Sequence, residues 1–85
     1  MLKLEVQRTA ASLLAELAER GLVVQLDTHD EVERHWHIGY AKRPGVLEIT
    51  DHGASCELKV ASNRDGGWAS LLARELAASG RHDTG

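Results

Sequence analysis

The chain of 85 residues has little of several residue types that commonly stabilise small proteins. It contains one cysteine, one proline, two tryptophans, one tyrosine and no phenylalanine. A single cysteine, Cys56, cannot form an intramolecular disulfide, which indicates a reducing compartment, and we expect a cytoplasmic protein. Because aromatic side chains are scarce, aliphatic side chains must fill most of the core.

Long apolar runs are also missing. The longest apolar stretch is far too short to cross a bilayer, and the segment MLKLEVQR lacks the apolar core of a signal peptide, so we expect no membrane partner. The length suits one domain, which we place over residues 1–80, with a flexible polar tail over residues 81–85. A core of this size leaves little room for a pocket that excludes water, so we expect neither an enzyme nor a bound cofactor.

The charge balance is weakly acidic. Ten Lys and Arg against 13 Asp and Glu give a net charge of −3, and protonation of all five histidines would bring it to +2. In its expected order of elements, a helix, several strands and a second helix, this chain is similar to double-stranded RNA-binding domains. Those domains hold phosphates with basic residues where the second helix begins. This chain has Arg64, Asp65, Gly66 and Gly67 there and no basic stripe, so we expect no nucleic-acid partner.

Two segments combine strong helix formers with helical spacing of apolar residues. The first helix is expected from about residue 3 to residue 20, and Gly21 ends it. Its start is ambiguous, because Leu2 and Leu4 also alternate with charged residues as in a strand, and Thr9 is a suitable N-cap. The second helix, expected to end at Gly80, has an apolar stripe of Trp68, Leu71, Leu72 and Leu76.

Between the helices, apolar and polar residues alternate in four segments, which predicts β-strands at residues 22–26, 32–40, 46–50 and 56–60. Loops over residues 42–45 and 51–54 place Ile38 opposite Ile49, and Ile49 opposite Cys56. All apolar strand residues then share one face, and the other face is polar. The sequence thus predicts a two-layer α+β fold: an N-terminal helix, a four-stranded antiparallel β-meander and a C-terminal helix, with both helices on one face of the sheet.

The polar face carries the first candidate site. His35 and His37 are two residues apart on one strand, so both imidazoles project from the same side. In the expected register Glu48 lies one diagonal step from His37 and directly opposite Glu57, and two facing carboxylates require a cation. That cation could be Lys59, a protonated histidine or a divalent metal, and a metal would be held by His35, His37, Glu48 and Glu57. The alternative is a solvated sheet face on which histidine and glutamate side chains partly neutralise each other's charges.

An acidic loop is a second candidate. Asp27, Asp30 and Glu31, beside His29, could hold Ca²⁺ or Mg²⁺. The order of ligands in an EF-hand loop is missing, so a charged connection between two strands is the favoured interpretation.

The start of the second helix is a third candidate. Gly66 and Gly67 expose backbone N–H groups that, together with Arg64, could hold a phosphate or a carboxylate. The alternative is a turn in which glycine lets Trp68 enter the core.

These features favour a small non-enzymatic interaction or regulatory module that binds another protein or itself, as a homodimer. Its contact surface is expected at an edge strand or on the polar face, at His35, His37, Glu48, Glu57 and Lys59. The alternative function is a small-ligand module, with a divalent metal on the polar face or an anion at the start of the second helix. The heavy use of Ala, Leu, Arg and Glu is typical of bacterial proteins.

Overall fold

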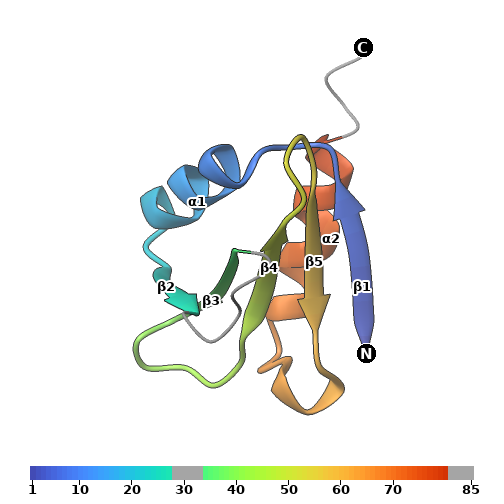
Figure 1. Cartoon of the computed structure of the whole chain (residues 1–85). Coiled ribbons are helices and arrows are strands. Elements are labelled where there is room, and N and C mark those ends of the chain that lie inside the picture. Colours follow the sequence, from blue (N-terminus) through green and yellow to red (C-terminus); the bar gives the residue numbers. More distant parts are fainter. Residues whose placement is uncertain (28–33, 81–85) are drawn as a thin grey trace.

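A computed structural model describes residues 1–27 and 34–80. The chain forms an α+β fold with one five-stranded antiparallel sheet, in the order β1-β5-β4-β3-β2, and two helices (Figure 1). The elements are β1 (Leu2–Val6), α1 (Ala10–Glu19), β2 (Val23–Asp27), β3 (His35–Gly39), β4 (Leu47–Asp51), β5 (Cys56–Val60), a 3₁₀ turn η1 (Ser62–Arg64) and α2 (Ala69–Gly80). None of the described helices is long and apolar enough to span a bilayer.

The prediction of a helix from residue 3 is wrong, because Leu2–Val6 forms the edge strand β1. Its apolar side chains alternate toward the core, and Leu4 lies opposite Leu58 of β5. The helix starts only after Thr9, whose hydroxyl accepts a hydrogen bond from the backbone N–H of Ser12 at 3.3 Å. The period-two alternation of this segment fits a strand that pairs with β5. That pairing involves a distant part of the chain, so the local sequence pattern alone does not reveal it.

The end of α1 agrees with the prediction made from Gly21. Gly21 has a positive φ of 86°, and its N–H donates to the carbonyl of Ala18 at 3.0 Å. The N–H of Leu22 donates to the carbonyl of Leu17 at 3.1 Å. This pair of bonds is the Schellman arrangement, which turns the chain from the helix directly into β2.

The predicted faces of the strands are correct, but the predicted register is wrong by two residues in both hairpins. Ile38 lies opposite Leu47, and Ile49 lies opposite Leu58. A shift of two residues keeps every side chain on its face and changes only its neighbour across the ladder. Consequently Glu48 lies opposite Lys59 and not opposite Glu57.

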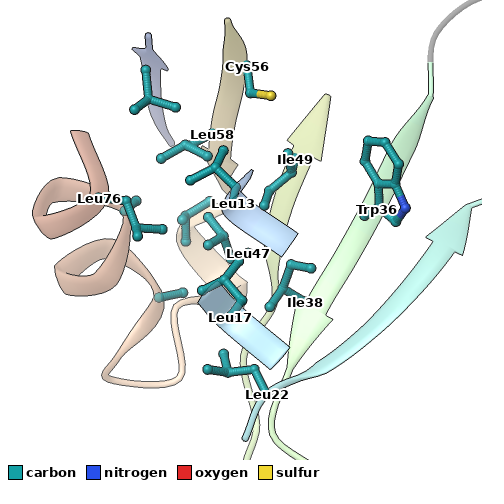
Figure 2. Packing of buried hydrophobic residues seen from close by; sticks show 14 of the residues in the cluster. Leu13, Leu17, Leu22, Trp36, Ile38, Leu47, Ile49, Cys56, Leu58 and Leu76 are labelled. Carbon is teal, nitrogen blue, oxygen red and sulfur yellow. The ribbon is translucent and has the colours of Figure 1, made fainter. Parts of the chain in front are cut away.

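Buried side chains from both helices and from alternate sheet positions form a single hydrophobic core. Figure 2 shows Leu13, Leu17 and Leu76 of the helices among Leu47 and Leu58 of the sheet, whereas Trp36 lies apart from them on β3. Cys56 is fully buried at the end of β5, as expected, and this burial raises the pKa of its thiol. The core is therefore mostly aliphatic, with Trp36 and Trp68 as its two buried aromatic side chains, and the Cys56 thiol behaves as a small apolar group.

Candidate functional site

The polar face of the sheet is built from two rows of side chains that run across all five strands. Residues that are directly opposite in an antiparallel ladder point to the same side, so the register fixes both rows. One row is Glu5, Glu57, Thr50, His35 and Asp27, and the other is Lys3, Lys59, Glu48, His37 and Gln25.

His35 lies at the centre of a hydrogen-bond network on this face. Its Nδ1 is 2.8 Å from the hydroxyl of Thr50, and its Nε2 is 2.9 Å from Oε1 of Glu48. Thr50 is buried, and the side chains of His35 and Glu48 are 15% and 18% exposed. The imidazole of His35 is thus held in one orientation by neighbours on β4.

His37 extends this network toward the edge of the sheet. Its ring meets that of His35 edge-on, with the centroids 5.3 Å apart. Its Nε2 is 3.6 Å from Oδ2 of Asp27 and 3.9 Å from Oε1 of Glu48. His37 is therefore a bridge between the carboxylates of β2 and β4.

Asp27 is the residue of this site that the sequence reasoning missed. It was assigned to the acidic loop, because the predicted strand ended one residue earlier. In the structure Asp27 closes β2 and lies opposite His35. The available signal was parity, since Asp27 is two residues after Gln25 and so points to the same face. The other members of that predicted loop, His29, Asp30 and Glu31, lie outside the described residues, as does the predicted tail.

Two of the predicted polar-face residues lie away from the histidines. Glu57 is opposite Glu5 and Thr50, and Lys59 is opposite Lys3 and Glu48. β4 lies between β5 and β3, so neither residue is a direct neighbour of a histidine. Glu48 therefore lies opposite a lysine on β5, and the predicted facing pair of Glu48 and Glu57 is wrong. The carboxylates that do face each other are those of Glu5 and Glu57.

A second histidine contact forms at the other end of the polar face. Glu5 accepts a hydrogen bond from the hydroxyl of Ser55 at 2.6 Å, and its Oε2 is 3.1 Å from Nδ1 of His52. The hydrogen bond from Ser55, aided by His52, holds the pKa of Glu5 below its ordinary value. The Glu5 side chain is 42% exposed, so this contact is more open to solvent than the one around His35.

The edge strand β2 borders the site. Its one strand neighbour among the described residues is β3, and it carries two exposed apolar side chains, Val23 and Leu26, which are 41% and 48% exposed. Beside His37 lies a pocket of about 280 Å³. Gly39, which is opposite Val23 in the ladder, lines this pocket together with Val23 and Val46.

At the predicted anion site the structure brings acceptor groups close to the glycines. The backbone carbonyl of Arg64 accepts a hydrogen bond from the N–H of Val46. The carboxylate of Asp65 accepts one from the N–H of Ser70 at 2.7 Å, near the start of α2. Gly66 packs against the carbonyl of Pro44. This packing accounts for Gly66, and anion binding at Arg64, Gly66 and Gly67 stays a prediction.

Comparison of the chain with protein-family models, with curated proteins and with solved structures finds no match. The features of the described surface that bear on function are the histidine network, the edge of β2 and the pocket beside them.

Proposed function

We propose that this protein is a small, non-enzymatic interaction module that pairs with a second copy of itself through β2. The observation that carries the proposal is the composition of this edge, which exposes Val23 on one face of the sheet and Leu26 on the other. An added strand covers apolar surface on both faces at once and satisfies the outward backbone groups of β2.

The opposite edge of the sheet is less suited to pairing. On β1, Leu2 and Leu4 pack against the core, and Lys3 and Glu5 occupy the other face. Charged residues, lysine above all, are the usual protection of an edge strand. β2 has neither lysine nor arginine, and its single charge is Asp27 at the end of the strand.

A second copy of β2 fits this edge in one antiparallel register. Centred on Gln25, the pairing places Val24 of one copy beside Leu26 of the other, on the side of the core. It also places Asp27 beside Val23, so the two aspartates do not face each other. The two five-stranded sheets then continue as one, with both polar faces on the same side, and the exposed surface of Leu26 is covered in each copy.

The pocket beside β2 supports a contact role more than a catalytic one. Its volume of about 280 Å³ lies below the ~300–1,000 Å³ of typical small-molecule sites. Of the residues that line it, His37 and Tyr40 are the titratable ones, and most of the others are apolar or glycine. Such a hollow suits a side chain of a partner strand.

Sedimentation over a wide range of protein concentration tests the proposal. A five-residue strand buries less than the ~1,200–2,000 Å² of stable complexes, so we expect a reversible dimer that dissociates on dilution. Leu26→Lys should abolish it by placing a charge in the apolar contact. The matched control is Leu71→Lys, which alters a leucine on α2 that is 71% exposed and should leave the dimer intact.

A protein that stays monomeric at millimolar concentration contradicts the proposal. So does a dimer that Leu71→Lys disrupts and Leu26→Lys does not.

A further inference from the structure

Three side chains able to bind a metal ion converge at the β2–β3 end of the polar face. Asp27, His35 and His37 each offer one ligand atom, and these atoms all lie within 4.8 Å of one another. The antiparallel register brings them together, because Asp27 is opposite His35, and His37 is two residues further along β3. No other set of three His, Cys, Asp or Glu side chains in the described part of the chain converges in this way.

Glu48 on β4 adds a fourth donor to this group. It lies opposite His37 in the ladder, and its Oε1 is within 3.9 Å of Nε2 of both histidines. Glu48 is not among the side chains whose ligand atoms all lie within 4.8 Å of one another, so it would complete a four-ligand site, drawn from three neighbouring strands, only after a side-chain rotation. Rigid strands suit a metal site, because the backbone hydrogen bonds hold the ligands in place before the ion arrives.

The distances are close to those a zinc ion requires. With bonds of ~2.0–2.2 Å and tetrahedral angles, neighbouring ligand atoms are ~3.3–3.6 Å apart. Nε2 of His37 is 3.6 Å from the Asp27 carboxylate and 3.9 Å from that of Glu48, and His35 is 2.9 Å from Glu48. Each of these three distances lies within the required range or a few tenths of an ångström from it.

Thr50 provides the supporting contact that a ligating histidine needs. Metal binding through Nε2 of His35 requires a proton on Nδ1, and that proton must be donated to an acceptor. The hydroxyl of Thr50, 2.8 Å from Nδ1, can serve as this acceptor. In the other tautomer the same hydroxyl donates to Nδ1 and the Nε2 proton goes to Glu48. The ion would thus replace one proton without leaving a buried group unsatisfied.

The charge of the group also matches a divalent cation. Two carboxylates and two neutral imidazoles carry two negative charges, and the exposed fractions of the side chains range from 15% for His35 to 38% for His37. Partial burial strengthens the attraction for the ion, and the more open side at His37 leaves a route for entry. Two nitrogen donors favour zinc and its transition-metal neighbours over Mg²⁺ and Ca²⁺, which prefer all-oxygen sites.

We propose that Asp27, His35, His37 and Glu48 bind one zinc ion on the polar face of the sheet. This set differs from the one predicted from the sequence by having Asp27 in place of Glu57. The site goes beyond the proposed pairing through β2 and does not depend on it, because each copy holds all four ligands.

Calorimetric titration of the chelator-treated full chain with Zn²⁺ tests this site. We expect one zinc ion to bind per chain. When Co²⁺ is used as the probe in place of Zn²⁺, we expect the d–d absorption spectrum that is typical of tetrahedral coordination. His37→Ala and Asp27→Asn each remove a direct ligand and should weaken binding by more than the ~10–100-fold typical of outer-shell changes. Thr50→Val should weaken it by about 10-fold, because it removes only the acceptor for His35.

The matched control is His52→Ala. This substitution removes an imidazole that contacts the Glu5 carboxylate at the other end of the polar face. Its zinc affinity should equal that of the unaltered chain, and circular dichroism checks that every variant is folded. The substitutions at His37 and Asp27 affect side chains outside the core, and Asp27→Asn keeps the side-chain shape. The proposal is overturned if zinc gives no heat, if binding survives both ligand substitutions in folded protein, or if His52→Ala removes it equally. Zinc binding is also measured with the Leu26→Lys variant, which keeps all four proposed ligands. Zinc binding by this variant in the absence of a dimer distinguishes the zinc site from the proposed pairing through β2.

Discussion

The two hairpins of the meander are held by different kinds of contact. The β4–β5 turn is tight and local: Asp51 and Cys56 are the last pair, and the N–H of His52 donates to the carbonyl of Ser55 at 3.0 Å. Gly53 in this turn has a positive φ of 91°, a conformation that glycine adopts without strain. At this turn the side chains of Ser55 and His52 contact Glu5 of β1, whose side chain is 42% exposed.

The β3–β4 loop, in contrast, is held by a segment distant in the sequence. The indole N–H of Trp68 donates to the carbonyl of Pro44 at 2.7 Å, and the N–H of Val46 donates to the carbonyl of Arg64 at 2.8 Å. Gly66 packs directly on Pro44. These contacts tie the loop to the segment that leads into α2.

This difference matters for the candidate site. The β3–β4 register puts Glu48 opposite His37 and Thr50 opposite His35. Both partners of the histidines on β4 therefore depend on a loop whose position is decided by residues 64–68. Substitutions at the loop should disturb the histidine network more than equivalent substitutions at the local turn.

The largest effect is expected from Gly66→Ala. Gly66 has a φ of 61°, and an added Cβ would overlap the backbone carbonyl of Pro44, which cannot move without the loop. We expect a loss of more than ~3 kcal/mol in the free energy of unfolding, measured with urea, because strain and overpacking add. The control is Gly67→Ala, with a φ of 81° and open space around the added Cβ, for which strain alone costs ~1–2 kcal/mol. Equal losses in the two variants would show that the contact with Pro44 is unimportant.

An intermediate effect is expected from Gly53→Ala at the local turn. The positive φ of 91° is unfavourable for alanine, but nothing lies within 4 Å of the added Cβ. We expect a loss of ~1–2 kcal/mol, with faster hydrogen exchange at the N–H of His52 and unchanged exchange at Val46. Faster exchange at Val46 would mean that the two hairpins are coupled and that the local description of this turn is wrong.

The smallest effect is expected from the contact of the turn with Glu5. Because the native state holds the pKa of Glu5 below its ordinary value of 4.5, this carboxyl stabilises the fold fully above that pH. The contribution is lost as the pH falls through the lower native pKa. Solvent screening limits it to ~0.5 kcal/mol or less. Thermal unfolding of Glu5→Gln and Ser55→Ala between pH 6 and pH 3 should show differences from the unaltered chain that shrink toward the acid end. A difference that grows on acidification would contradict this assignment.

Much of the fold was accessible from the sequence. The alternation of Ile38, Leu47, Ile49 and Leu58 with polar residues identifies the buried face of the sheet, and Gly21 marks the end of α1. The first strand was not identified, because Leu2–Val6 fits both a helical and a strand pattern when read alone. Only its pairing with β5, more than fifty residues later in the chain, makes the strand the better structure.

The candidate site was accessible in part. His35, His37 and Glu48 were expected on one face, and the structure brings their side chains together. Asp27 was missed because its strand neighbour, His35, depends on the register of β2 against β3. Glu57 was included because the β4–β5 register was predicted two residues away from the observed one.

The alternation of apolar and polar residues was enough to assign side chains to the core or to the polar face, because alternation is a local property that survives any shift of two residues. Which residues stand opposite each other depended on the fold. Contacts between segments distant in the sequence, such as those of Trp68 and Gly66 with Pro44 in the β3–β4 loop, exist only in the folded chain. The two histidines were therefore visible in the sequence as a pair, whereas their carboxylate neighbours followed from the fold.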